Sequence, residues 1–388
     1  MELLELENVH IFLILHYNCY YFVPLGQNAN ESRHSDQAQK SKHFQPYLHI
    51  SRATCQNIRK QLGGNHMCTA ISYRSNHFYF GRTLDHDESY REEVIVIPRH
   101  FPLPYLNTPT DHYSIIAMAH IANGYPLLYD GVNEKGLAMA GLNFVSYSHY
   151  SFPRDDVRNV PAYALISCIL GECSSVSEAK SLLTTICITN ENYSEKLPSP
   201  HLHWIIADKN ESITVESCVD GLHIHDNPLG VLTNNPPFDQ QLLNLSNYIM
   251  LSEKPPVNNF PGAQNLSVYS NGMGAIGLPG DFSSQSRFVR AAFFCGSSSR
   301  EATESGCVTQ FFHILGGVAQ INGCCQLPNG NYEKTVYSSC CNCDEGIYYY
   351  TSYGNRQISA VHMHECNLNN KQLFRYPLIL EQQIKKQN

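Results

Sequence analysis

The chain has 388 residues, of which 43% are hydrophobic and 15% are charged, and its formal net charge is −8. A chain of this length can bury a large core, but it contains no block of basic residues that would follow a nucleic-acid backbone. No stretch approaches the roughly 20 apolar residues that a membrane-spanning helix needs, so we expect neither nucleic acid nor membrane insertion.

The first 66 residues differ from the rest, because they are rich in His, Gln, Asn and Ser and show no steady periodicity. The apolar run at 11–26 follows an acidic start, whereas a secretory signal has a basic one, so we expect no export. Shortly before Met67, the adjacent codons of Gly63 and Gly64 can supply the purine run of a bacterial ribosome-binding site. We therefore predict that residues 1–66 are a disordered leader, either translated upstream sequence or a propeptide.

Cysteine usage bears on the compartment. The chain has 15 cysteines, an odd number, and it is far longer than the small secreted domains that depend on disulfides. Reduced thiols are the simpler interpretation, and together with the missing export signal they predict a cytoplasmic protein.

After the leader, short strands and helices follow one another in clusters. The runs at 69–74 and 78–83 are rich in aromatic or β-branched residues and predict a β-hairpin. Clusters of this kind favour antiparallel sheets covered by helices, and we expect one layered domain over 67–388. Further strands are predicted at 92–99, 113–120, 137–144, 203–208, 212–217, 346–353 and 358–364, and helices at 160–172, 175–186 and 285–295. The second of these helices begins with the capping pattern Ser-x-x-Glu, at Ser175 and Glu178.

Cys68 carries the chemistry that the sequence suggests first. A cysteine at the start of a chain offers a thiol as nucleophile and a free α-amine as base, with ordinary pKa values near ~8.5 and ~7.7 to 8.0. Both functions require removal of Met67, because an amide nitrogen does not accept the proton. The hypothesis is an N-terminal-nucleophile amidase that needs no separate catalytic histidine.

Arg82 and Asp85 follow the predicted hairpin and admit two interpretations. A cation near the sulfur favours the thiolate and a carboxylate can hold the amine, so both side chains suit a site at Cys68. Their spacing alone is more typical of an exposed ion pair. From spacing and composition, both interpretations stay open.

Several motifs carry a family resemblance. MCTAISYRSNHFYFGRTLD at 67–85, DGVNEKGLAMAGLNF at 130–144 and LGVLTNNPPFD at 229–239 closely resemble choloylglycine hydrolases, the family of bile-salt hydrolases and penicillin V acylases. The match continues through 277–293 and 345–361, so it covers nearly all of residues 67–388. Nothing in the first 66 residues belongs to it.

The resemblance implies a fold, a site and a substrate class. The fold is a four-layer αββα sandwich of two antiparallel sheets, in the α+β class, often assembled as a homotetramer. Asparagines supply the oxyanion hole, and conjugated bile acids are cleaved to release glycine or taurine without metal or organic cofactor. The catalytic positions of the family fall on Cys68, Arg82, Asp85, Asn143, Asn234 and Arg287.

Asn143 favours the bile-salt hydrolases, because penicillin V acylases usually have tyrosine at this position. Penicillin V acylase or N-acyl homoserine lactone acylase activity is the alternative among enzymes. An inactive relative that binds bile acids or other sterols is the alternative outside them.

Other signals are discounted. The G-x-G-x-x-G at 272–277 lacks the following helix of a dinucleotide site, so we expect a flexible loop that leads to Arg287. The cysteines at 324–343 lack paired C-x-x-C spacing, so ordinary thiols are expected there. Trp204 is expected in the core, and aromatic residues at 101–105 and 144–150 are candidates for sterol contact. The three histidine pairs are expected at the surface and not at a metal: His201 and His203, His223 and His225, and His362 and His364.

Overall fold

The computed structural model describes residues 3–6, 9–16, 19–24 and 66–388, and the chain divides into the compact units Met1–Arg52 and Ala53–Asn388. In the first unit, three strands that the sequence pattern did not predict form an antiparallel sheet. These strands are β1 (Leu3–Leu6), β2 (Val9–His16) and β3 (Cys19–Pro24). Residues 25–65 lie outside the described residues, and the origin and removal of the predicted leader stay predictions.

The second unit contains a six-stranded antiparallel sheet with the order β15-β4-β5-β16-β17-β18. The predicted hairpin is confirmed as β4 and β5, and Cys68 opens β4 opposite Leu84 of β5. The strands are β4 (Cys68–Arg74), β5 (Phe78–His86), β15 (Val231–Leu232), β16 (Lys334–Asn342), β17 (Ile347–Ser352) and β18 (Ser359–His362).

An eight-stranded antiparallel sheet faces the first, with the order β14-β13-β12-β9-β8-β7-β6-β19. Its strands are β6 (Glu93–Ile97), β7 (Ile115–Ala122), β8 (Tyr125–Asn133), β9 (Ala138–Asn143), β12 (Leu202–Ala207), β13 (Ser212–Cys218), β14 (Gly221–Asp226) and β19 (Phe374–Pro377). A separate parallel pair consists of β10 (Arg158–Pro161) and β11 (Ile186–Thr189).

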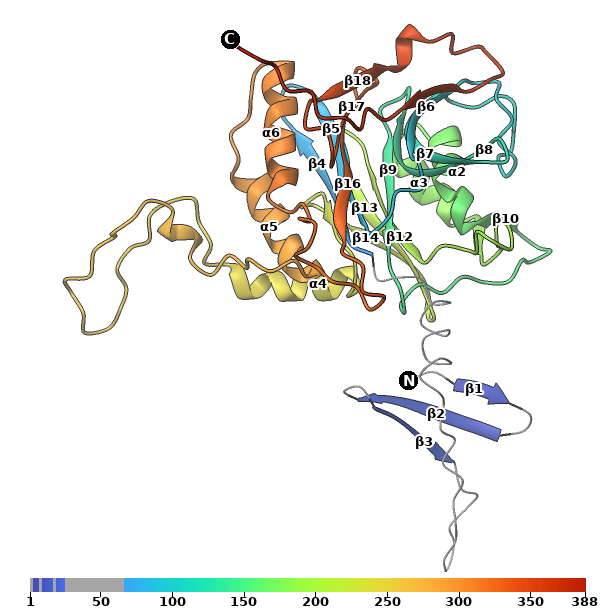
Figure 1. Ribbon diagram of the computed structural model, residues 1–388. Coiled ribbons are helices and arrows are strands. Elements are labelled where there is room, and N and C mark those ends of the chain that lie inside the picture. Colours follow the sequence, from blue (N-terminus) through green and yellow to red (C-terminus); the bar gives the residue numbers. More distant parts are fainter. Residues whose placement is uncertain (1–2, 7–8, 17–18, 25–65) are drawn as a thin grey trace, which may run out of the picture. The chain divides into compact units, whose positions relative to one another are not determined.

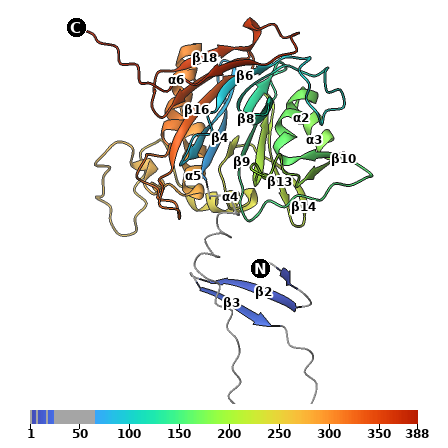
Figure 2. The same cartoon turned by 45° about the vertical axis from the view of Figure 1, so that its right-hand side comes forward.

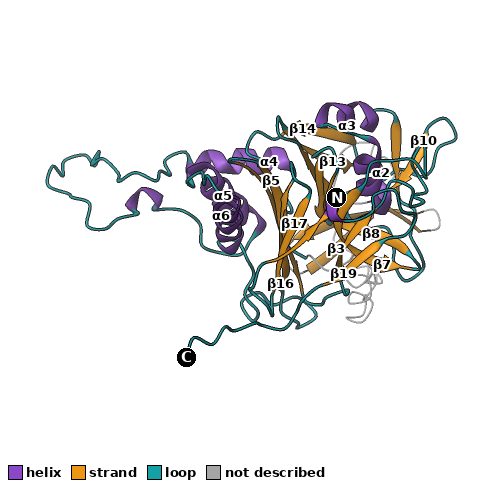
Figure 3. Cartoon of the chain, turned by 90° about the horizontal axis from the view of Figure 1, so that it is seen from above, coloured by secondary structure: helices purple, strands orange, loops and turns teal. Residues whose placement is uncertain are grey.

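Helices cover the outer faces of both sheets, and the view from above in Figure 3 separates the layers. The predicted capping of the second helix is confirmed, since the Ser175 side chain accepts from the N–H of Glu178. The α-helices are α2 (Leu165–Glu172) and α3 (Val176–Leu183) on the eight-stranded sheet, and α4 (Phe238–Leu245), α5 (Ser284–Ser297) and α6 (Glu304–Gly316) beside the six-stranded sheet. Short 3-10 turns lie at Ala162–Ala164, Ser246–Tyr248, Met273–Ala275 and Met363–Glu365.

Two hydrophobic cores hold these layers together. One contains Cys68 and fills the space between the sheets, continuing beneath α5 and α6. The other joins α2 and α3 to the outer face of the eight-stranded sheet and contains Trp204, which is the predicted core aromatic. Because side chains of a strand alternate between its two faces, one strand of the eight-stranded sheet contributes side chains to both cores. The four-layer αββα fold is confirmed (Figure 2).

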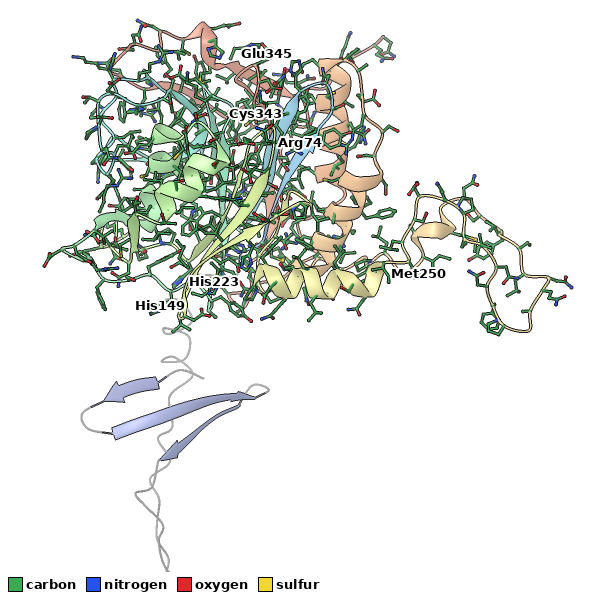
Figure 4. All side chains as sticks on the ribbon, turned by 180° about the vertical axis from the view of Figure 1, so that it is seen from behind. Arg74, His149, His223, Met250, Cys343 and Glu345 are labelled. Carbon is green, nitrogen blue, oxygen red and sulfur yellow. The ribbon has the colours of Figure 1, made fainter. Side chains whose placement is uncertain are left out.

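A long segment leaves the domain between α4 and α5 (Figure 1). We call residues 246–283 the arm, and Figure 4 labels Met250 near its base. The sequence pattern predicted a loop only for 272–277 and did not predict a projection of this length. Within the described part of the chain, no helix is long and apolar enough to cross a membrane.

Candidate active site

Cys68 lies at the first position of β4, where the hairpin places it between the two sheets with only 3% of its surface exposed. Burial raises the pKa of its thiol, while the nearby guanidinium groups of Arg82 and Arg287 act in the opposite direction. The sulfur is thus held in an apolar setting with cations on two sides. A thiolate formed there has its charge partners already in place.

The backbone nitrogen of Cys68 faces Asn234, which follows β15. This nitrogen donates to Oδ1 of Asn234 at 2.7 Å, and Nδ2 of Asn234 donates to the carbonyl of Asn143 at 2.8 Å. Asn143 ends β9 in the opposite sheet, and its Nδ2 donates to the carbonyl of His66 at 3.2 Å. The structure therefore brings both predicted asparagines to the start of β4.

Arg287 reaches the same point from α5. Its Nη2 donates to Oδ1 of Asn234 at 2.8 Å, and its Nη1 donates to Oγ1 of Thr69 at 2.7 Å and also to the carbonyl of Cys68. Burial lowers the pKa of this guanidinium although Asp85 and Cys68 favour its charge. Arg287 thus fixes both the main chain at the nucleophile and the amide of Asn234.

Arg82 and Asp85 are buried on β5, which excludes the exposed ion pair. Arg82 donates to the carbonyl of Tyr129 at 3.2 Å and to that of Gly141, so it joins the two sheets. Burial disfavours its charge, but Cys68 and other negative neighbours outweigh that effect and raise its pKa.

Asp85 is held by hydroxyl groups. Its Oδ1 accepts from Thr335 at 2.6 Å and its Oδ2 accepts from Thr83 at 3.1 Å. Burial raises its pKa to about 6, against the lowering effect of Arg287. These contacts hold the carboxyl in one orientation beside Cys68.

Glu333 is a site residue that sequence reasoning missed. It is fully buried directly before β16, and its Oε1 accepts from the N–H of Met67 at 2.5 Å. Burial raises the pKa of its carboxyl to about 8. No motif marks this position, because a single glutamate before a strand is common in sequences. Only the folded chain brings Glu333 to Met67, 266 positions upstream.

The main chain before Cys68 occupies polar groups of the site. The carbonyl of Met67 accepts from the N–H of Asp85 at 3.0 Å, and the carbonyl of His66 accepts from Asn143. In this connected form the nitrogen of Cys68 is an amide and not an amine. The chemistry predicted from the sequence therefore requires the bond between Met67 and Cys68 to be broken.

Two groups of potential metal ligands occur within residues 66–388. One consists of His66, His86 and Asp87, and the other of Cys218, Asp220 and His223. The cysteines at 324–343 belong to neither group, and Cys343 is a buried free thiol. The 272–277 segment forms a short 3-10 turn within the arm.

Two expectations about aromatic and histidine side chains are wrong. Phe101 and Tyr105 pack against the core under α2 and α3, on the side of the eight-stranded sheet away from Cys68, so they do not line the site. His203 is fully buried and not at the surface. Figure 4 labels His149 and His223 at one end of the domain. His223 is partly exposed, as expected.

Comparisons with known proteins decide the family. Residues 68–376 match the sequence model described as linear amide C-N hydrolases, choloylglycine hydrolase family. The chain belongs to the choloylglycine hydrolase family. This choloylglycine hydrolase is 50% identical over 319 residues to a bile salt hydrolase/transferase of Lactiplantibacillus plantarum, covering 82% of this chain and 98% of the relative. It is therefore an enzyme that cleaves C–N bonds of linear amides.

Other relatives agree. A bile salt hydrolase/transferase of Clostridium perfringens is 37% identical, over 80% of this chain and 96% of that protein. A crystal structure of the conjugated bile acid hydrolase from Clostridium perfringens superimposes with a TM-score of 0.77 at 35% identity, covering 83% of this hydrolase and all of that chain. Penicillin V acylase from Agrobacterium tumefaciens shares the fold, with a TM-score of 0.61 at 20% identity over 79% of this chain and 90% of that one.

Proposed function

We propose that this choloylglycine hydrolase is a bile salt hydrolase that cleaves glycine- and taurine-conjugated bile acids, with Cys68 as nucleophile. The observation that carries the proposal is the convergence on one buried cysteine of two arginines, an aspartate and two asparagines. The named activities of the similar proteins supply the substrate class.

The proposed reaction begins after the bond between Met67 and Cys68 has been broken. The freed α-amine takes the thiol proton, and the sulfur attacks the amide carbonyl of the substrate. The amine is held by Oδ1 of Asn234, which already accepts from this nitrogen. Glycine or taurine leaves with the proton, and water then hydrolyses the thioester with the same amine as base.

The two asparagines are proposed to hold the oxyanion. Nδ2 of Asn143 points to a carbonyl oxygen of the upstream chain, and removal of that chain frees it for the substrate oxygen. A donor aimed at a developing oxyanion contributes ~3 to 4 kcal/mol to the transition state, because the negative charge grows there. Asp85 and Arg287 keep the amine and the asparagine in place.

The test uses Cys68→Ala. We expect no hydrolysis of glycocholate or taurocholate by this variant, with the fold intact by circular dichroism, because the alanine fits the same buried position. The mass of the active parent enzyme should correspond to a chain that begins at Cys68. Substantial turnover by the variant, or an active enzyme with residue 67 still attached, would contradict the mechanism.

Parallel assays separate the alternatives. Penicillin V and an N-acyl homoserine lactone present the same amide on a different acyl group, so turnover of either above that of glycocholate would favour the acylase alternative. A protein that binds cholate but turns over none of these amides would be the inactive relative. Asn143 supports the bile-salt assignment, since the acylases resembling this chain usually have tyrosine there.

We also propose a homotetramer in the cytoplasm. The arm exposes apolar side chains such as Met250 and Tyr269, at 82% and 84%, and these are suited to burial against another copy. Every cysteine from residue 66 onward is a free thiol, which supports a reducing compartment. Light scattering of the parent should give four copies, and replacement of residues 252–274 by a short Gly-Ser linker should reduce that number. A parent that is a monomer would contradict the assembly.

A further inference from the structure

His203 occupies a position that the catalytic proposal does not use. It lies in β12, is fully buried, and pairs across the sheet with Leu142, the neighbour of Asn143. Its Nδ1 is 3.0 Å from Oε1 of Glu216, and its Nε2 is 2.9 Å from the carbonyl oxygen of Thr233. A buried polar ring with two specific partners is costly to place in a core unless both bonds form.

Both partners of the ring are acceptors. Glu216 is buried as well, and its two oxygens also accept from the N–H of Phe238 at 3.1 and 3.3 Å. The carbonyl oxygen of Thr233 can only accept, so Nε2 of His203 carries a hydrogen. Nδ1 and Glu216 share a proton in the second hydrogen bond, so both ring nitrogens have a partner.

The ring connects the two loops that carry the oxyanion asparagines. Thr233, whose carbonyl it holds, directly precedes Asn234. Phe144, which directly follows Asn143, stacks on the ring with centroids 4.2 Å apart and planes 6° from parallel. One side chain thus contacts the neighbour of each asparagine.

We propose that His203, held by Glu216, is a positioning residue that sets the relative placement of Asn143 and Asn234. This inference rests on the proposed function, because it assigns His203 to the same oxyanion site. Donors stabilise a transition state only when they are fixed at the oxyanion position before reaction, and small displacements weaken them strongly. Loss of the ring should therefore slow the chemical step while substrate binding persists.

A second contact of the network supports this role. Gln241 of α4 donates from Nε2 to the carbonyl of Asn234 at 3.2 Å, and Glu216 accepts from Phe238 at the start of the same helix. Glu216 consequently holds both the imidazole ring of His203 and the helix that contacts Asn234. The position of Asn234 is fixed from two sides through one carboxylate.

The experiment compares His203→Gln with His225→Gln in the full chain. His225 is the matched control, because its Nε2 is 3.6 Å from Oε2 of the same Glu216 while its ring lies beside Phe238 and is partly exposed. Steady-state hydrolysis of glycocholate gives kcat and KM, and a thiol reagent gives the reaction rate of Cys68. For His203→Gln we expect kcat to fall at least about tenfold, with KM and the thiol rate within about twofold of the parent.

Three outcomes would overturn the inference: an unchanged kcat in His203→Gln, a rise in KM without a fall in kcat, or an equal fall in the His225→Gln control. If His203→Gln does not fold, Glu216→Gln provides the same comparison, since it keeps an acceptor for Phe238 and removes the carboxyl group that contacts the ring. A parent that does not hydrolyse glycocholate refutes the bile-salt proposal. An active parent with a fully active His203→Gln refutes only the positioning role.

Discussion

The buried carboxyl of Glu333 makes the stability of the chain that retains Met67 depend on pH. Its pKa is about 8 in the folded chain, against an ordinary value of 4.5. The folded chain therefore keeps a proton that the unfolded chain releases between these two values, so the free energy of unfolding falls as pH rises. The contribution is greatest below pH 4.5 and is lost as pH passes through about 8.

The size of this effect follows from the same two values. At about 1.36 kcal/mol for each pKa unit, a rise from 4.5 to about 8 corresponds to an upper limit of about 5 kcal/mol. Glu333→Gln removes the titration and keeps an oxygen that accepts from Met67. We expect the variant to lose little stability at pH 5 and to be more stable than its parent by about 2 to 4 kcal/mol at pH 9.

Urea unfolding at pH 5, 7 and 9 measures the difference. Both chains carry Cys68→Ala to prevent any cleavage that depends on the Cys68 thiol, and the mass of each chain is checked so that the contact of Met67 with Glu333 is retained. Groups common to the two chains cancel in the comparison, which leaves the titration of residue 333. Parallel pH profiles for the variant and its parent would show that this carboxyl ionises freely in the folded state, and the argument from burial would fail.

Two further substitutions test the packing around Arg82. Gly81→Ala places a Cβ 2.0 Å from the carbonyl oxygen of Ser339 in β16, so we expect a loss of about 1 to 3 kcal/mol or more in urea unfolding. Gly280→Ala meets nothing within 4 Å and is the control, and an equal loss there would contradict the steric explanation. Asp130→Asn weakens an acceptor that the hydroxyls of Tyr337 and Tyr348 contact at 2.6 Å beside Arg82, so we expect a loss of at least about 2 kcal/mol, and an unchanged stability would contradict it.

The sequence predicted the elements that local pattern determines. Alternating aromatic and β-branched residues predicted the hairpin that presents Cys68, and Ser175 with Glu178 predicted the start of α3. β8 was missed because its aromatic and small residues interrupt the alternation, and α6 was missed although Thr303 caps it. Local pattern does not show which sheet a strand joins, so the layers followed only from the family resemblance.

The predicted site residues lie in sequence motifs, whereas the missed site residues do not. Cys68 and Asn234 stand in motifs that the family shares, so each was recognised in its own segment. Glu333 and His203 stand in no such motif, and their roles depend on burial and on partners contributed by other elements. A histidine two positions from another on a strand predicts a shared face, but it does not predict whether that face meets solvent or an apolar layer.

The placement of the site at the meeting of two sheets explains this difference. Arg82 on β5 donates to the backbone of β9, and Asn234 after β15 donates to the residue that ends β9, so the site exists only when both sheets are assembled. A charged group buried between the two sheets is stable only when it has a partner. When that partner lies on another strand, the sequence around the charged residue does not predict the contact. Buried ionisable residues near Cys68 are therefore the positions where the structure adds most to the sequence, and Glu333 and the His203–Glu216 pair are the two that mutation can test separately.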